Sequence, residues 1–181
     1  SNSSAASDVY KRQVMFDGSR LSMEKNIKLT CQVKTMAQRF RVAVEAEIGE
    51  MPKTGDRFQK SNLLGLDTIE RFIKKTRVDF LALPLGTKHG MPAPGGKEHI
   101  NINYLKKISK GIKVPLVLHG ASGVGKQELR QARRDGVAKV NFDTALRKIF
   151  TYALGKFLKA NPQEDDLRVY LKEARIATEK I

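Results

Sequence analysis

The feature that most constrains the fold is a short apolar run, residues 114–118, that ends on His119 and leads through a glycine-rich turn into a helix. Four of its five residues are Val or Leu, which is typical of a strand buried on both faces of a sheet. Residues 120–125 then hold three glycines and a serine, and a helical pattern opens at Lys126. A strand, a glycine turn and a helix in this order direct backbone N–H groups at one point. The segment therefore predicts a cradle for an anion.

The same alternation of strand and helix repeats about five times along the chain. Strands are expected at residues 14–17, 42–49, 80–86, 114–118 and 137–143, and helices at residues 29–40, 67–73, 103–110, 126–135, 144–157 and 167–177. Asp67 and Thr144 are the expected N-caps of their helices. Buried strands that alternate with helices predict a parallel α/β fold. A TIM (β/α)8 barrel has this rhythm, but it needs eight strands.

Composition favours a protein of a reducing compartment. The 181 residues include one cysteine, Cys31, and no apolar run of signal-peptide or membrane-spanning type, so we expect a cytoplasmic protein without membrane contact. The net charge of +15 favours an anionic ligand, although basic residues spread along a whole chain more often form a solvated surface. Residues 1–13 are small, polar and patternless, which predicts a disordered or non-native leader before a folded region at 14–181.

Polar side chains of chemical interest stand near the ends of the predicted strands. They are Asp17, Glu47, His89, His119, Asn141 and Asp143. Because the carboxyl ends of parallel strands meet at one edge of the sheet, we expect these side chains to gather there. One strand-end histidine is by itself more often a buried structural residue, and a buried carboxylate needs a cation or a lysine beside it.

Five short motifs resemble a known family. In chain order they are VMFDGS (14–19), EAEIG (45–49), GTKHG (86–90), LVLHGASG (116–123) and VNFDT (140–144). Together they are similar to the class II, metal-dependent aldolases that cleave fructose or tagatose 1,6-bisphosphate to dihydroxyacetone phosphate and glyceraldehyde 3-phosphate. The resemblance implies a partial TIM barrel, about strands four to eight with their helices, in residues 14–181. It also implies a role in glycolysis or related carbohydrate metabolism, and a dimer or tetramer in full-length form.

The resemblance assigns roles to individual residues. It implies that His89 and His119 are two of three histidine ligands of a catalytic zinc ion, which polarises the substrate carbonyl and stabilises the enediolate. It implies that Asp17 and Glu47 can hold a second cation, and a monovalent cation is the second cofactor that we consider. The residues that match phosphate- and ketose-binding positions are Gly90, Gly120, Ser122, Asn141, Asp143 and Thr144. The alternative for these six is an ordinary set of turn glycines and a helix cap.

The chain also departs from the family pattern. The catalytic base of the family, an Asp beside the third zinc histidine, matches nothing in this sequence, so we expect no catalytic residue here and no cleavage by the 181-residue chain. The acidic residues that follow the second motif in the family are largely lost in residues 50–56. Five strands of a barrel leave two open sheet edges, which predicts oligomerisation or poor solubility.

Two other classes of function stay open. Residues 120–127, GASGVGKQ, nearly fit the nucleotide-binding pattern G-x-x-x-x-G-K-[ST], but Gln127 stands where a hydroxyl binds Mg²⁺. The positive charge also suits a non-catalytic relic that binds phosphate or nucleic acid. Nucleic-acid binding is the weaker interpretation, because aromatic residues interleaved with Arg and Lys are not evident.

Overall fold

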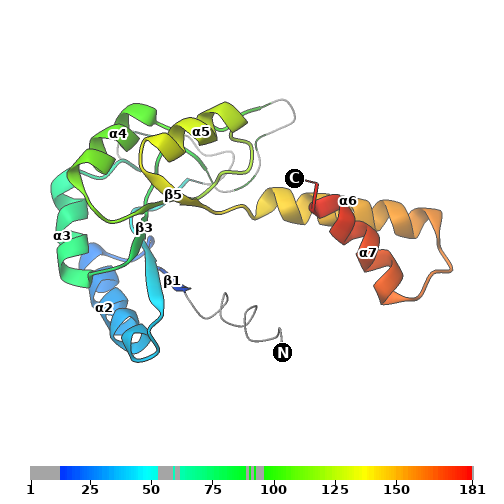
Figure 1. Ribbon diagram of the computed structural model, residues 1–181, viewed down its shortest axis with the longest axis horizontal. Helices are drawn as coiled ribbons and strands as arrows, with labels where there is room; N and C mark the ends of the chain where they lie inside the picture. Colours follow the sequence, from blue (N-terminus) through cyan, green and yellow to red (C-terminus); the bar gives the residue numbers. More distant parts are fainter. Residues whose placement is uncertain are drawn as a thin grey trace. The chain divides into compact units, whose positions relative to one another are not determined.

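The computed structural model describes residues 13–52, 59, 62–88, 90, 92 and 96–180. Within them, strands and helices alternate along the chain as far as α6, which α7 follows directly (Figure 1). The strands are β1 (Gln13–Asp17), β2 (Ala43–Glu47), β3 (Phe80–Ala82), β4 (Leu116–Leu118) and β5 (Val137–Val140). The helices are α2 (Met23–Arg39), α3 (Leu66–Thr76), α4 (Ile102–Gly111), α5 (Lys126–Arg134), α6 (Thr144–Ala160) and α7 (Leu167–Thr178). The chain divides into two compact units, Ser1–Asn141 and Phe142–Ile181.

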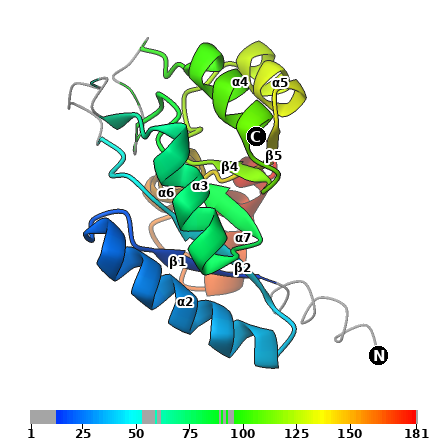
Figure 2. The same cartoon turned by 90° about the vertical axis from the view of Figure 1, so that its left-hand side faces the viewer.

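The first unit is a parallel sheet with helices on one face. Its strands follow the order β1-β2-β3-β4-β5, and each pair of neighbours is parallel. Each connection between neighbouring strands is expected to be a right-handed crossover, and all of them step in the same direction along the sheet. One face of the sheet is therefore covered by the four connecting helices, α2, α3, α4 and α5. Figure 2 shows α2, α3 and α4 arranged along this face. The predicted parallel α/β fold is confirmed, in the arrangement of consecutive strands of a partial TIM barrel.

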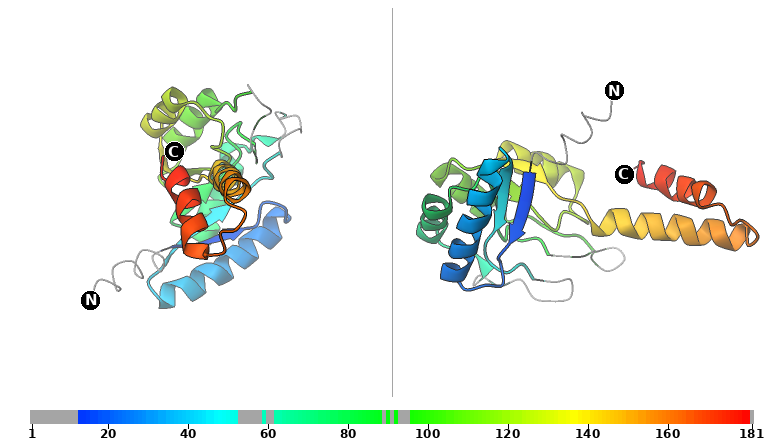
Figure 3. Two further views of the ribbon diagram at one scale, coloured as in Figure 1. Left: turned by 90° about the vertical axis from the view of Figure 1, so that its right-hand side faces the viewer. Right: turned by 90° about the horizontal axis from the view of Figure 1, so that it is seen from below.

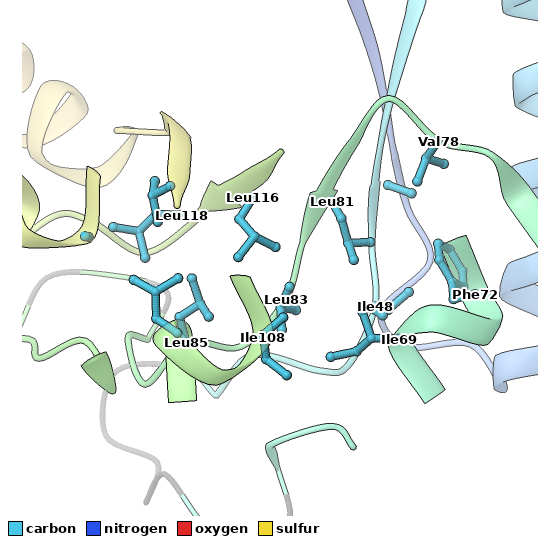
Figure 4. Close-up of a cluster of buried hydrophobic side chains, with 14 of the residues drawn as sticks. Ile48, Ile69, Phe72, Val78, Leu81, Leu83, Leu85, Ile108, Leu116 and Leu118 are labelled. Atoms are coloured by element: carbon cyan, nitrogen blue, oxygen red, sulfur yellow. The ribbon is translucent and has the colours of Figure 1, made fainter. Parts of the chain in front are cut away.

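Side chains of the strands alternate between the two faces of the sheet. On the helix-covered face, Leu81 and Leu116 belong with Phe72 of α3 to one apolar core (Figure 4). In β2, Val44 and Ala46 belong to this apolar core. Glu45 and Glu47 alternate with them, lie outside the apolar cluster and are also buried. The alternation that builds the core therefore also directs two carboxylates to the opposite face.

Some predicted boundaries are wrong by a few residues. The strand expected at 80–86 ends at Ala82, because Pro84 has no N–H for a ladder hydrogen bond. The helix expected from Asp67 begins at Leu66, with Gly65 as N-cap. Gln13, assigned to the leader, is the first residue of β1; the rest of the predicted leader lies outside the described residues.

The second unit is a hairpin of α6 and α7, and Figure 3 shows α7 turning back along α6. Thr144 is the first residue of α6 and not its cap; Asp143 occupies the N-cap position without a side-chain capping hydrogen bond. Several large apolar side chains of the hairpin are exposed, Tyr152 and Leu167 most of all. In the part of the chain that the structure describes, no helix combines the length and the apolar character needed to span a membrane.

Candidate functional site

His119 lies directly after β4 and is held between two carboxylates of β2. Its Nε2 is 2.9 Å from Oε1 of Glu45, and its Nδ1 is 2.9 Å from Oε2 of Glu47. The three side chains are 7%, 0% and 2% exposed, respectively. Each ring nitrogen thus faces a carboxylate oxygen, which only accepts hydrogen bonds when it is ionised, and this geometry favours a doubly protonated ring.

Two side chains of the β5 segment also belong to this cluster, and Nε2 of Gln13 on β1 donates to Oε2 of Glu45 as well. Nζ of Lys139 donates to Oε2 of Glu45. The side-chain amide of Asn141 lies 2.9 Å from Nε2 of His119. Since β2, β4 and β5 are parallel, the cluster forms where the side chains of these strands face one another across the sheet surface opposite the helices.

The protonation states follow from these contacts. Burial by itself would lower the pKa of His119, but the hydrogen bonds to Glu45 and Glu47 raise it to about 9. Burial by itself would raise the pKa of Glu45, but the hydrogen bonds from His119 and Lys139 bring it below its usual value. At neutral pH the Glu45 carboxyl is therefore ionised and the His119 ring is protonated.

The turn after His119 is packed tightly against the loop that follows β3. The Thr87 hydroxyl donates to the carbonyl of His119 at 2.7 Å. A Cβ added to Gly120 would lie 2.4 Å from the carbonyl oxygen of Lys88, and Gly120 has a φ of +65°. Only glycine fits this close approach of two backbone segments. The turn continues through Ser122, which is buried.

The structure brings part of the predicted site together. Glu47, His119 and Asn141 share the cluster, and Gly120 and Ser122 continue the turn that begins at His119. Gly90 has a φ of +116°, which suits a glycine turn. His89 lies outside the described residues.

For three of the predicted residues, the structure describes only local contacts or a place in the second unit. Asp17 is opposite Glu47 in the strand register, but its exposed carboxylate accepts hydrogen bonds from the backbone N–H and hydroxyl of Ser19. Asp143 and Thr144 belong to the second unit, where Asp143 is exposed and forms a bidentate ion pair with Arg147. Their predicted roles stay predictions.

Two members of the cluster were absent from the predicted site. Glu45 and Lys139 each stand two residues before a predicted site residue on the same strand segment, before Glu47 and Asn141. The period of two along a strand, which places such pairs on one face, is the signal that could have identified them.

The donor types of the cluster suit zinc, since imidazole and carboxylate are both zinc ligands in proteins. His119 offers one imidazole, and Glu45 and Glu47 offer carboxylates beside it. Among the described residues, no group of three or more His, Cys, Asp or Glu side chains is placed to hold a metal ion. A zinc ligand role for His119 requires one ring nitrogen to exchange its carboxylate partner for the metal.

Comparisons with known proteins agree with the motif resemblance. The family model described as fructose-bisphosphate aldolase class-II matches residues 3–181. The YdjI aldolase of Escherichia coli K12 is similar in structure, with a TM-score of 0.71 and 25% identity over 98% of this chain and 60% of that one.

Two further solved structures are similar. A protein of Coccidioides immitis assigned provisionally as a fructose-1,6-bisphosphate aldolase has a TM-score of 0.76 and 26% identity, over 93% of this chain and 59% of that one. The fructose-bisphosphate aldolase of Campylobacter jejuni shares the fold, with a TM-score of 0.68 and 22% identity over 98% and 61% of the two chains. The chain thus spans about 60% of the length of the structures that it matches.

Proposed function

The chain belongs to the class II fructose-bisphosphate aldolase family, and we propose that its first unit supplies metal- and phosphate-binding residues to an aldol site for a ketose 1,6-bisphosphate. The reaction is cleavage of fructose or tagatose 1,6-bisphosphate to dihydroxyacetone phosphate and glyceraldehyde 3-phosphate, or the reverse condensation. The observation that carries the proposal is the buried cluster of Glu45, His119 and Glu47 at the start of a glycine turn.

In this proposal His119 and His89 are the zinc ligands that the chain contributes. Bound zinc supplies Lewis-acid polarisation of the substrate carbonyl. When one ring nitrogen of His119 binds the metal, the carboxylate on the other nitrogen, Glu45 or Glu47, would orient the ring, as outer-shell carboxylates orient metal-binding histidines. Glu47 and Asp17 are the proposed ligands of a second cation, which is monovalent in our proposal.

The glycine turn is the proposed phosphate site. Gly120 and Ser122 follow the strand and precede α5, so their backbone N–H groups lie near a helix N-terminus, where anions bind favourably. Gly90 and Asn141 supply further contacts to the phosphate and the ketose in this proposal. The net charge of +15 supports an anionic ligand.

We propose further that the 181-residue chain binds zinc and dihydroxyacetone phosphate without cleaving a ketose bisphosphate, because no residue in it matches the proton-transferring Asp of the family. Its single thiol, Cys31, supports a cytoplasmic protein. The exposed apolar side chains of the second unit support a homo-oligomer.

The test is a calorimetric titration of the chelator-stripped chain with zinc, then with dihydroxyacetone phosphate. Wild type and His99→Asn, a matched control at an exposed histidine, are expected to bind zinc, whereas His119→Asn is expected to bind it at least about tenfold more weakly, the factor for 1.4 kcal/mol. Zinc affinity that is equal in all three proteins, or no heat from dihydroxyacetone phosphate, refutes the proposal. Stabilisation by ATP but not by sugar phosphates would instead favour the nucleotide-binding interpretation.

Catalysis is tested separately with fructose and tagatose 1,6-bisphosphate and a coupled assay for glyceraldehyde 3-phosphate. No cleavage is expected from the 181-residue chain. Cleavage that a chelator abolishes would show that the chain carries its own proton-transferring group.

A further inference from the structure

Two segments outside the histidine cluster are joined backbone to backbone. We name residues 96–101, which lead into α4, the returning arm, and residues 120–124 the glycine turn. The N–H of Glu98 donates to the carbonyl of Gly123 at 3.2 Å, and Glu98 forms an isolated parallel bridge with Val124. A Cβ on Gly123, which has a φ of +108°, would lie 3.6 Å from Cγ of Glu98. The returning arm and the glycine turn are therefore in close contact.

Glu128 of α5 ties the returning arm to this place. Its Oε1 accepts a hydrogen bond from the backbone N–H of Ile100 at 2.6 Å, and its Oε2 lies 3.3 Å from Nδ1 of His99. The Glu128 side chain is only 22% exposed. The arm is held on its other side by the hydrogen bond from the N–H of Asn101 to the carbonyl of Leu85, at 2.6 Å. Glu128 is thus the side chain through which α5 holds the arm.

We propose that Glu128 is a positioning residue for anion binding: through Ile100 and the returning arm, it fixes the backbone of the glycine turn. The proposal rests on the proposed function in one respect, that the glycine turn receives the phosphate. Backbone N–H groups bind an anion best when their direction is fixed before the ligand arrives, since ordering a loop on binding costs affinity. Glu128 is proposed to fix the backbone of the glycine turn in this way without itself contacting the ligand.

A general loss of structure would lower the affinities for zinc and for the phosphorylated ligand together, whereas loss of Glu128 is expected to affect only the second. His119 is placed by β4 and by its contacts with Glu45 and Glu47, none of which involves the returning arm. The glycine turn depends on the arm through Glu98. Loss of Glu128 is therefore expected to weaken phosphate binding while zinc binding is kept.

The first test compares Glu128→Ala, Glu128→Gln and the matched control Glu70→Ala, which removes an exposed carboxylate from α3. Dihydroxyacetone phosphate is expected to bind Glu128→Ala about tenfold more weakly, a factor that corresponds to 1.4 kcal/mol, with zinc affinity within about twofold of wild type. Glu128→Gln is expected to retain phosphate affinity within about threefold, because its amide oxygen still accepts from Ile100. Equal phosphate affinity in wild type and Glu128→Ala, or a parallel loss of zinc and phosphate binding, overturns the proposal.

The second test needs no ligand. Hydrogen exchange of the Glu98, Ile100 and Val124 amides is expected to be faster in Glu128→Ala than in wild type and Glu70→Ala. Unchanged exchange at all three amides overturns the proposal, whatever the ligand does. If wild type binds no dihydroxyacetone phosphate, the proposed function fails, and the exchange result still decides whether Glu128 fixes the turn. Glu128→Asp, which keeps the charge but withdraws the carboxylate by one methylene, replaces the alanine variant if that variant does not fold.

Discussion

Raising the pH from 6 to 10 is expected to destabilise the metal-free protein through His119. The contacts with Glu45 and Glu47 raise the pKa of His119 from 6.5 to about 9 in the folded state, so the folded chain binds this proton more tightly than the unfolded chain. The stabilisation is therefore fully present below pH 6.5, declines as the pH rises, and is lost above about pH 9.

The size of this effect follows from the two pKa values. A difference of about 2.5 pH units at about 1.4 kcal/mol per unit corresponds to about 3 kcal/mol of unfolding free energy. The His119 side chain is 7% exposed, so solvent screening reduces this value little. Glu45, whose pKa is lowered, affects stability in the acid range instead. Its contribution to the free energy of unfolding is present above its unfolded pKa and is lost only as the pH falls into the acid range.

The assay is urea unfolding in the presence of a chelator at several pH values between 6 and 10. Other groups also titrate in this range, so the informative quantity is the difference between wild type and Glu47→Gln, which removes one of the two carboxylates. Between pH 6 and pH 10, the free energy of unfolding of this variant is expected to decrease by about half as much as that of wild type. His99→Asn, at an exposed histidine, is expected to show the same decrease as wild type. Parallel curves for wild type and Glu47→Gln would refute the reasoning.

Other substitutions test the packing, each by the free energy of unfolding in urea. Phe72→Ala empties a fully buried core position and is expected to cost about 3–5 kcal/mol; Phe40→Ala, at an exposed residue, is expected to cost less than about 0.5 kcal/mol. Gly120→Ala is expected to destabilise by more than about 1 kcal/mol, because its Cβ would meet the Lys88 carbonyl at a positive φ. Gly155→Ala, where a Cβ meets nothing within 4 Å, is expected to stabilise α6 by up to about 1 kcal/mol; a loss of stability there would contradict the space that we describe.

The order and type of the elements could be predicted because each strand is a local apolar run. Leu116 and Leu118 indicate β4 by themselves, and the glycine turn after them indicates the next helix. The ends of the strands were less predictable, since they depend on hydrogen bonds between segments that are distant in the sequence. The apolar run after Phe80 continues to Leu85, but the ladder stops at Ala82, before Pro84.

The site could be predicted only in part, for a related reason. His119 and Glu47 are conspicuous at strand ends, whereas Glu45 and Lys139 belong to the site because they form an ion pair with each other. Their ion pair joins residues 94 positions apart in the sequence, and it depends on the sheet order that brings β2, β4 and β5 into one surface. The contact of Glu128 with Ile100 likewise spans 28 positions and crosses from a helix to a loop. No local pattern in the sequence contains such pairs.

The charges of the cluster explain why a chain of net charge +15 keeps two buried carboxylates beside a site proposed for anions. In formal charges, two glutamate carboxylates face one imidazolium and one lysine, so the charges of Glu45, Glu47, His119 and Lys139 cancel. Under the proposed function, exchange of the His119 proton for Zn²⁺ would leave the cluster and its metal with one net positive charge. Without Glu45 and Glu47 that charge would be three, in a largely buried place where uncompensated charge is costly. Under the proposed function, the carboxylates would thus hold the histidine without metal and limit the positive charge with metal, and the remaining positive charge would still favour a phosphorylated ligand.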